Sequence, residues 1–393
     1  PAYLWPQVDY LVLNENEAET LTGVIVHDPH SAVAAAMHLR PPAAASHLRP
    51  SAAHATATTY YIGASGSAGA GSSCASPNYV GGAGIASAVA AASNGDTIIV
   101  CEGVFAINSL IRISNKALTI RGTNTAAETI LNGGNSLTGI FQVESATSTT
   151  IQKLTFINSK GRAQGSAIYY DVNGLYTTAS TAHQLSDCIF AQNYASSQAG
   201  AVYVGGDAMN NNKFLGTITI SNNLFVENSA GYDGAAVTAY NVNVDGDPSH
   251  MIVDGNKFLY NWTVSRSAGA IASIFNSLTV SNNYFYMNNT LADGNQTTLY
   301  GRMKVVSNII ISAITGSRKS CEIDDLGALN SSGNKVDNAN CVTSADTSVV
   351  VPSFTQVTRS AALALTGTFI PESPKINSAT KTDTTANLTL AVR

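Results

Sequence analysis

The sequence repeats one phrase four times, as Ile220-Ser-Asn-Asn223-Leu-Phe225-Val-Glu-Asn228, Val253-Asp-Gly-Asn256-Lys-Phe258-Leu-Tyr-Asn261, Val280-Ser-Asn-Asn283-Tyr-Phe285-Tyr-Met-Asn288 and, shortened, Val305-Val-Ser-Asn308-Ile-Ile310. A period of about 25 to 35 residues that reuses one apolar and polar phrase is typical of a solenoid. In a solenoid each repeat buries its face against the next one. The repeat therefore predicts the fold and leaves the function open.

Two positions of the phrase predict the side chains that face inward. One is an aromatic ring, at Phe156, Phe190, Phe225, Phe258 and Phe285. The other is an aliphatic residue five positions earlier, at Ile151, Leu185, Ile220, Val253 and Val280. Stacking of identical rings at strand spacing buries apolar area and adds about 0.5–1.5 kcal/mol for each aromatic pair. We expect these two columns to form the core.

The residue two positions before the ring is an asparagine in the later repeats and Cys188 or Leu154 in the earlier ones. Asparagine tolerates the left-handed conformation, so we expect it to form the turn between two strands. Stacked amides can also hydrogen-bond along the axis. A further asparagine follows the ring by three positions. At Asn261 and Asn288 it coincides with a glycosylation sequon, which we interpret as a product of the repeat.

Composition agrees with stacked strands and tight turns. Only 11% of the 393 residues are charged, against roughly 25% in a typical soluble domain. The net charge of −5 is spread without long runs, which argues against a nucleic-acid-binding face. No run of 18 apolar residues is present, so we expect no transmembrane helix.

Short strands with alternating polarity succeed one another from Thr97 to about Ile314, and a small-residue phrase such as Gly165-Ser-Ala-Ile168 follows each ring. An alanine-rich run from Gly84 to Ser93 precedes them and stops at Asn94-Gly95, a pair that favours left-handed conformations. Because the terminal edge of a β-stack must be covered, we predict that this run is an N-terminal capping helix.

The paired patterns Phe-x-x-Asn and Gly-Gly-Ala-Ile resemble the polymorphic outer-membrane protein repeats and, more broadly, the pectin-lyase-like superfamily. The resemblance covers about residues 60–350. It implies an all-β fold, a single-stranded right-handed parallel β-helix (solenoid) with an N-terminal capping helix. That superfamily includes adhesins, secreted passengers and polysaccharide enzymes alike, so activity stays open. We assign 59–350 to the β-helix and 351–393 to a C-terminal cap or tail.

A short α/β fragment over residues 1–40 and a linker or low-complexity stretch over 41–58 precede the β-helix. The segment from Val8 to Gly23 resembles the ribokinase family of sugar kinases, and Asn14 and Glu17 would occupy its Asn-x-x-Glu motif. That family also needs Gly-Ala-Gly-Asp, and the nearest match here ends in Ile85, which cannot accept a proton. We interpret the fragment as a kinase remnant without kinase activity.

Five cysteines bear on the compartment. Cys74 and Cys101 bracket the first turn of the repeat region, and Cys321 and Cys341 bracket a polar loop near its end. Two disulfides with a leftover Cys188 fit a protein that is secreted or at the cell surface. The alternative is five unpaired thiols in a cytosolic chain, because spacing alone does not establish connectivity.

Candidate ligand-binding residues are Tyr169, Tyr203 and Tyr240, which fall in or just after the small-residue strand of successive coils. Outward-facing rings would form an aromatic strip on which sugar rings stack. The alternative is that about half of these rings belong to the core, as alternation requires.

Candidate metal ligands are Asn243, Asp245 and Asp247, whose alternating oxygens are similar to a calcium loop. A full Ca²⁺ site takes about 6–8 oxygens, and no glutamate closes this one. The segment is therefore either a Ca²⁺ site or an acidic loop tip, and we expect no other cofactor.

These observations favour a monomeric, secreted or cell-surface β-helix that acts as an adhesin-like or carbohydrate-contacting scaffold without an evident catalytic site. Its expected partner is a polysaccharide or a host-surface glycan. An alternative is a polysaccharide lyase or glycoside hydrolase whose site is built from Asp171, Asp207, Asp233 and Asp245. The second alternative, a sugar kinase, depends on Asn14 and Glu17 alone.

Overall fold

The computed structural model of the chain describes residues 57–134, 139–144, 148–171, 181–205, 216–240, 248–265, 268–290, 298–311, 321–323 and 332–336. The chain divides into two units, 1–56 and 57–393, and all described residues belong to the second. Asn14, Glu17, the predicted linker up to residue 56 and the predicted tail lie outside the described residues. Within them, no helix has the length and apolarity needed to cross a membrane.

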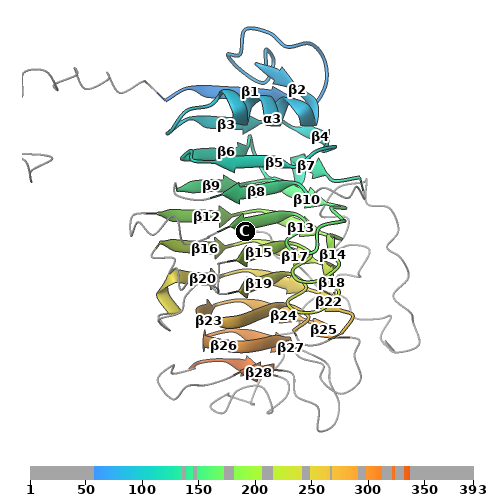
Figure 1. Cartoon of the computed structure of the whole chain (residues 1–393), viewed down its shortest axis with the longest axis vertical. Coiled ribbons are helices and arrows are strands. Elements are labelled where there is room, and N and C mark those ends of the chain that lie inside the picture. The colour runs from blue at the N-terminus through green and yellow to red at the C-terminus, as the bar shows by residue number, and fades with distance from the viewer. Residues whose placement is uncertain are drawn as a thin grey trace, which may run out of the picture. The chain divides into compact units, whose positions relative to one another are not determined.

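The described residues form a stack of coils in which strands of successive coils pair in parallel (Figure 1). Going along a coil, the chain passes through a first wall, a second wall, a short four-stranded sheet and a third wall. The loops between these strands change in length from coil to coil, whereas the strands keep their register. This arrangement is the parallel β-helix that the repeat predicts.

The strands of the first wall are β3 (Thr97–Val100), β6 (Leu118–Gly122), β9 (Thr149–Gln152), β12 (Ala182–Ser186), β16 (Thr217–Ser221) and β20 (Met251–Asp254). The strands of the second wall are β4 (Gly103–Ala106), β7 (Thr129–Asn132), β10 (Thr155–Ile157), β13 (Ile189–Ala191), β17 (Leu224–Val226), β21 (Lys257–Leu259), β24 (Tyr284–Tyr286), β27 (Ile309–Ile311) and β29 (Lys335–Val336).

The four-stranded sheet comprises β14 (Tyr194–Ala195), β18 (Ser229–Ala230), β22 (Trp262–Thr263) and β25 (Asn289–Thr290). The third wall comprises β5 (Ile111–Ser114), β8 (Phe141–Glu144), β11 (Ile168–Asp171), β15 (Val202–Gly205), β19 (Val237–Tyr240) and β28 (Cys321–Ile323). Two 3-10 turns, η2 (Ala126–Glu128) and η4 (Pro248–His250), lie between strands.

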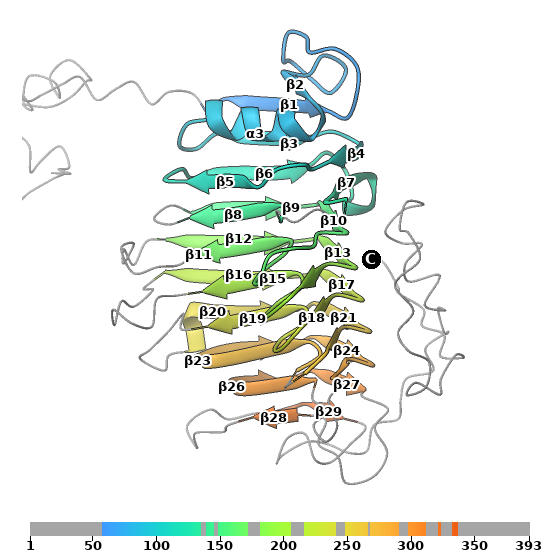
Figure 2. The ribbon, with the colours of Figure 1, turned by 45° about the vertical axis from the view of Figure 1, so that its right-hand side comes forward.

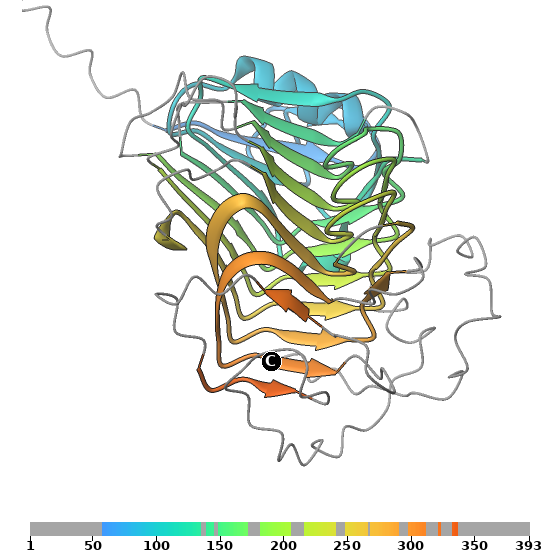
Figure 3. The same cartoon turned by 60° about the horizontal axis from the view of Figure 1, so that its bottom comes forward.

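Two longer strands join the third wall to the first. β23 (Ile271–Ser281) pairs with β19 through its first residues and with β20 through its last ones. β26 (Leu299–Val306) pairs with β23 on both sides of a register shift. Figure 3 shows both strands curving from one wall to the other.

The inward faces of the three walls meet in one apolar core. The rings of Phe156, Phe190, Phe225, Phe258 and Phe285 are fully buried and in register on the second wall. Successive centroids lie 4.7 to 4.9 Å apart, and the ring planes differ by 3° to 9°. The aliphatic column of the phrase faces them from the first wall. Both predicted columns are therefore confirmed.

The asparagine column forms a buried ladder at the corner between the first and second walls. The Nδ2 of Asn223 donates to the Oδ1 of Asn256 at 3.0 Å and to the Leu185 carbonyl at 2.9 Å. The pattern continues through Asn283 and Asn308. Each of these side-chain amides therefore hydrogen-bonds to the coil before it and to the coil after it, which satisfies its buried donor group.

The expected position of the left-handed residue was wrong by one. Left-handed φ angles occur at Asn222 (56°), Gly255 (66°) and Asn282 (55°), directly before the ladder asparagines. The turn residue thus rotates the chain so that its successor points inward. A second ladder runs through Asn193, Asn228, Asn261 and Asn288 at the next corner. The sequons at Asn261 and Asn288 are fully buried in this ladder, as their origin in the repeat predicts.

The first coil is covered by a cap of β1 (Thr59–Gly63), β2 (Tyr79–Val80) and α3 (Gly81–Ala91), seen at the top of Figure 2. The predicted capping helix is present and begins three residues earlier than expected. Lys116 donates from Nζ to the carbonyls of Val89 and Ala90, at 2.9 and 2.8 Å, and so supplies donors to carbonyls of the last turn of α3.

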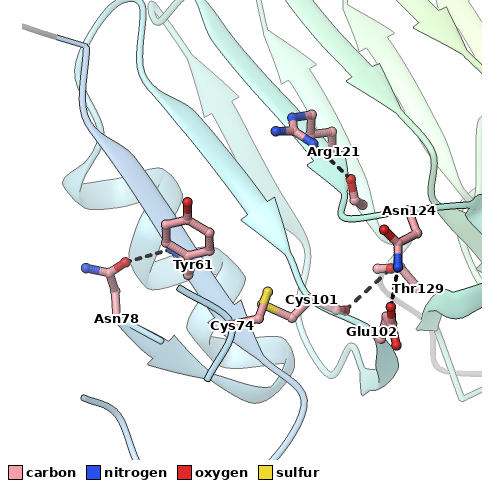
Figure 4. Close-up of a disulfide and its surroundings, with 9 residues drawn as sticks. Tyr61, Cys74, Asn78, Cys101, Glu102, Arg121, Asn124 and Thr129 are labelled. Atoms are coloured by element: carbon pink, nitrogen blue, oxygen red, sulfur yellow. Dashed lines mark hydrogen bonds between the residues drawn. A yellow bond between two sulfur atoms is a disulfide. The ribbon is translucent and has the colours of Figure 1, made fainter. Parts of the chain in front are cut away.

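A disulfide fastens the cap to the first coil. Cys74 lies in the loop between β1 and β2, and it is bonded to Cys101 directly after β3 (Figure 4). The predicted pairing of these two cysteines is confirmed. Cys321 is also disulfide-bonded, Cys341 lies outside the described residues, and Cys188 is a free, buried thiol.

Removing one ring from the stack tests this account of the core. We expect Phe258→Ala to lower the free energy of unfolding by about 3–5 kcal/mol, because it leaves a cavity between two stacked neighbours. The control is Val104→Ala, at a side chain that is 38% exposed, with an expected change within about 0.5 kcal/mol. Equilibrium urea unfolding followed by circular dichroism measures both. Equal effects of the two substitutions would contradict the stacked core.

Candidate functional site

The outward side chains of the third wall form two rows in register. The first row is Arg112, Gln142, Tyr169, Tyr203 and Thr238. The second row, two residues further along each strand, is Ser114, Glu144, Asp171, Gly205 and Tyr240. Because paired strands lie about 4.8 Å apart, each side chain is within reach of its neighbours in the row.

Three planar groups of this face form one layer. The Arg162 guanidinium carbon lies 4.6 Å from the Tyr169 ring centroid. The Tyr169 ring stacks on that of Tyr203 at 5.2 Å and 6°. Arg162 also donates to Gln142 Oε1 at 3.0 Å, and Gln142 precedes Tyr169 in the row whereas Tyr203 follows it. Arg162 and Tyr203 therefore cover opposite faces of Tyr169, and we call the three the Arg162–Tyr203 layer.

Neighbouring residues hold Tyr203 in this position. Its ring lies over Gly205, where an added Cβ would come within 2.3 Å of Tyr203 Cε1. Gln164 donates from Nε2 to the Tyr203 hydroxyl at 3.2 Å and to Gln198 Oε1 at 3.3 Å. Gln198 in turn donates to Asp233 at 3.3 Å. The chain of amides thus links the layer to the loops that enter the third wall.

Charges on this face are balanced. Arg112 forms a salt bridge with Glu144, which also accepts a hydrogen bond from Ser114 Oγ at 2.6 Å. Asp171 is in register with Glu144. Burial lowers the pKa of Arg162, while Asp171 and Glu144 act in the opposite direction. Among the described residues of this face, the charges of two arginines and two carboxylates balance.

The two phenols of the layer are held in their neutral form. Burial raises the pKa of Tyr169 to about 12, with a further increase from Asp171. Burial also raises the pKa of Tyr203, which is 2% exposed. Neither phenol is a general base near neutral pH, because the phenolate is absent there. The layer therefore supplies no phenolate for proton abstraction, and its accessible groups are the half-buried Arg162 and Tyr169.

The structure brings two of the three predicted tyrosines together. Tyr169 and Tyr203 stack on each other, whereas Tyr240 lies in the second row in register with Gly205. Asn243, Asp245 and Asp247, the predicted calcium ligands, lie outside the described residues. Among the described ranges, no three His, Cys, Asp or Glu side chains gather as a metal site would require.

Two of the four carboxylates of the enzyme alternative lie in the described part of the chain. Asp171 stands beside Glu144 on the outer face, and Asp233 is buried with Gln198. Asp207 and Asp245 lie outside the described residues. The sequence analysis missed Arg112 and Arg162. Arg112 could have been found, because it follows the inward Ile111 as Tyr169 follows the inward Ile168, and this alternation predicts an outward side chain.

Tyr170, His183 and Cys188 lie inside the coil and belong to the core. The rings of Tyr170 and His183 are 5.5 Å apart, and each side chain is almost fully buried. Burial lowers the pKa of His183 to about 4 and raises that of Cys188 to about 12. A neutral imidazole and a protonated thiol without solvent access do not form a nucleophilic site.

No protein-family model matches the sequence, and no curated protein matches it. Among solved structures, the chain is similar to one described as the PL6 family alginate lyase AlyGC, with a TM-score of 0.34 and 13% sequence identity. The match covers 67% of this chain and 40% of that chain, so the chain spans less than half of the lyase. A similarity this low carries no argument about substrate, and the strand pairing itself defines the parallel β-helix.

The titration of Tyr169 tests the geometry of the layer. We expect its phenol to remain protonated past pH 10 and to ionise near 12, because burial disfavours the phenolate. Since tyrosines of an unfolded chain ionise near pH 10, the folded state should lose stability as pH rises from about 10 to 12. NMR of ¹³Cζ-labelled tyrosine, assigned with Tyr169→Phe, measures the value. Ionisation of Tyr169 near pH 10 in the folded protein would contradict the buried stack.

Proposed function

We propose that this chain is a carbohydrate-binding β-helix that contacts a glycan through the outer face of the third wall. The observation that carries the proposal is the Arg162–Tyr203 layer, a rigid stack of planar groups edged by the amides of Gln142 and Gln164. A sugar ring has hydroxyls around its rim and C–H bonds on its faces. The half-buried Arg162 and Tyr169 can meet the hydroxyl rim of such a ligand with a guanidinium group and a phenol.

The balance of charge supports an uncharged, hydroxyl-rich ligand. Arg112 and Glu144 already neutralise each other, and Arg162 has Asp171 near it. Guanidinium donors and carboxylate acceptors side by side can each hydrogen-bond a hydroxyl, which both donates and accepts. A repeating row of such groups along the stack suits a polymer better than a single small molecule.

Binding is favoured over cleavage by the state of the carboxylates. A glycosidase needs one carboxyl group as a proton donor and a second as a nucleophile or base. Glu144 is tied to Arg112 and Ser114, and Asp233 is buried and held by Gln198. These two carboxylates are therefore poorly placed for acid–base catalysis, and we favour a scaffold that binds without cleaving.

Export of the chain is part of the same proposal. The Cys74–Cys101 bond and the disulfide at Cys321 support a secreted or cell-surface protein, because disulfides persist in oxidising compartments. An adhesin-like role at the surface would use the outer face of the third wall for attachment to a polysaccharide or a host glycan.

Binding of the full chain to a panel of neutral and acidic polysaccharides tests the proposal. We expect Arg162→Ala to weaken binding about tenfold or more, because a hydrogen bond to a charged group contributes about 1.5–3 kcal/mol and 1.4 kcal/mol corresponds to tenfold. Tyr169→Ala should also weaken binding, because it removes the ring on which the Arg162 guanidinium lies. Affinity electrophoresis or calorimetry measures the change.

The matched control is Arg121→Ala, at an arginine of β6 on the first wall, which should leave binding unchanged. Binding by none of the glycans, or equal binding by all variants, would overturn the proposal. Release of shortened chains from any polysaccharide would replace it with the lyase or hydrolase alternative.

A further inference from the structure

The four-stranded sheet carries two half-buried aromatic side chains on its outer face. Tyr194 of β14 and Trp262 of β22 both pair with Ser229 of β18, one from each side. The next residues of these strands, Ala195, Ala230 and Thr263, are fully buried, so alternation directs the two rings outward. In Figure 1 the strands β14, β18, β22 and β25 form a vertical stack along one side of the coils.

Two further large apolar side chains lie directly after β18 and β22. Tyr232 and Val264 are each 46% exposed, and the described residues contain only one other large hydrophobic residue in this class, Val104. The Val264 N–H donates to the Ala230 carbonyl at 2.9 Å, which places Val264 in the coil next to Tyr232. We call Tyr194, Tyr232, Trp262 and Val264 the aromatic patch.

The spacing within the patch follows from the strand register. Tyr194 and Trp262 are two coils apart, which corresponds to about 9.6 Å along the axis. Ser229, the small residue between them, is 7% exposed. This separation is close to the length of a disaccharide, so two sugar residues of one chain that have a third residue between them can meet the two rings.

The chemistry around the rings is that of a neutral, hydroxylated ligand. Ser196, Ser197 and Ser265 supply hydroxyl groups at the surface beside the patch. Among the described residues, the charged side chain in register with the patch is Lys160, next to Tyr194. Aromatic rings among hydroxyls, with little charge, match the C–H faces and hydroxyl rims of uncharged sugars.

The patch adjoins the Arg162–Tyr203 layer. Tyr232 directly precedes Asp233, which accepts a hydrogen bond from Gln198. Gln198 accepts one from Gln164, which also donates to Tyr203. A chain of hydrogen-bonded side chains therefore connects Asp233, the residue after Tyr232, to the Tyr203 hydroxyl on the third wall.

We propose that the aromatic patch is a second carbohydrate-contact surface, which takes neutral sugar residues by stacking their C–H faces on Trp262, Tyr194 and Tyr232. This inference rests on the proposed function, because it extends the same glycan beyond the third wall. It differs in chemistry: the patch binds by stacking, whereas the layer binds by hydrogen bonds from Arg162 and its neighbours.

Tryptophan fluorescence gives a direct test, because the chain has only two tryptophans, Trp5 and Trp262. In the full-length Trp5→Phe variant the emission comes from Trp262 alone. Titration with cellohexaose, mannohexaose and laminarihexaose should shift this emission in a saturable way with at least one of them. Trp262→Ala and Tyr232→Ala should each weaken binding of that hexasaccharide by up to about tenfold.

Trp262→Phe keeps a ring and should retain most of the binding, which separates stacking from misfolding. The matched control is Val104→Ala, an exposed apolar residue of the second wall, with no expected effect. Calorimetry can show that a hexasaccharide binds while the Trp262 emission does not shift and both alanine variants keep their affinity. That result would overturn the inference about the patch and leave the proposed function standing. If no glycan binds, both are overturned. A shift of Trp262 emission with protein concentration alone would assign the patch to a second copy of the chain and overturn the inference.

Discussion

Stacking of identical side chains at the spacing of paired β-strands is the interaction on which the rest of this molecule depends. Each ring of the Phe156 to Phe285 column lies within 5 Å of the next, and almost no tilt separates them. The rings can stack only if successive coils stay in register, and the coils stay in register because a slip by one residue would turn every ring outward. The apolar column and the parallel sheet thus enforce each other.

The asparagine ladders add polar specificity at the corners where an apolar core cannot. A chain that turns between two walls leaves carbonyl and N–H groups without a strand partner. Asn223 and Asn256 satisfy them by bonding the backbone of one neighbouring coil and the side chain of the other. Because a shift by one residue would break every rung, the ladders fix the same register that the rings require.

The outer face of the third wall follows from this register. Arg112, Gln142, Tyr169 and Tyr203 are distant in sequence, and only the pairing of β5, β8, β11 and β15 brings them into a row. The layer then needs one further condition, which is space for the Tyr203 ring over Gly205. This row is built from the second residue of each strand, so its side chains can differ without any change in the core.

The sequence predicted the repeated core columns, the capping helix and the Cys74–Cys101 bond, and it missed contacts made between coils. Phe225 and Phe258 recur with their neighbours, so their inward direction could be read from the phrase alone. The left-handed turn was placed at Asn223 instead of Asn222, since both residues are asparagine and local preference does not distinguish them. Arg162 was missed because its place over Tyr169 depends on a loop that belongs to one coil and on contacts across coils.

Cross-linking between coils measures the central claim, the register, most directly. Thr219 and Ile252 are paired on the outer face of β16 and β20, and an in-register pair has the Cα separation that a disulfide needs. Thr219→Cys with Ile252→Cys should therefore form a bond on mild oxidation, detected by peptide mapping under non-reducing conditions. Thr219→Cys with Asp254→Cys places the thiols two residues out of register, about 8 Å apart, and should remain largely reduced. Equal cross-linking of the two pairs, or none in the first, would contradict the stacked coils.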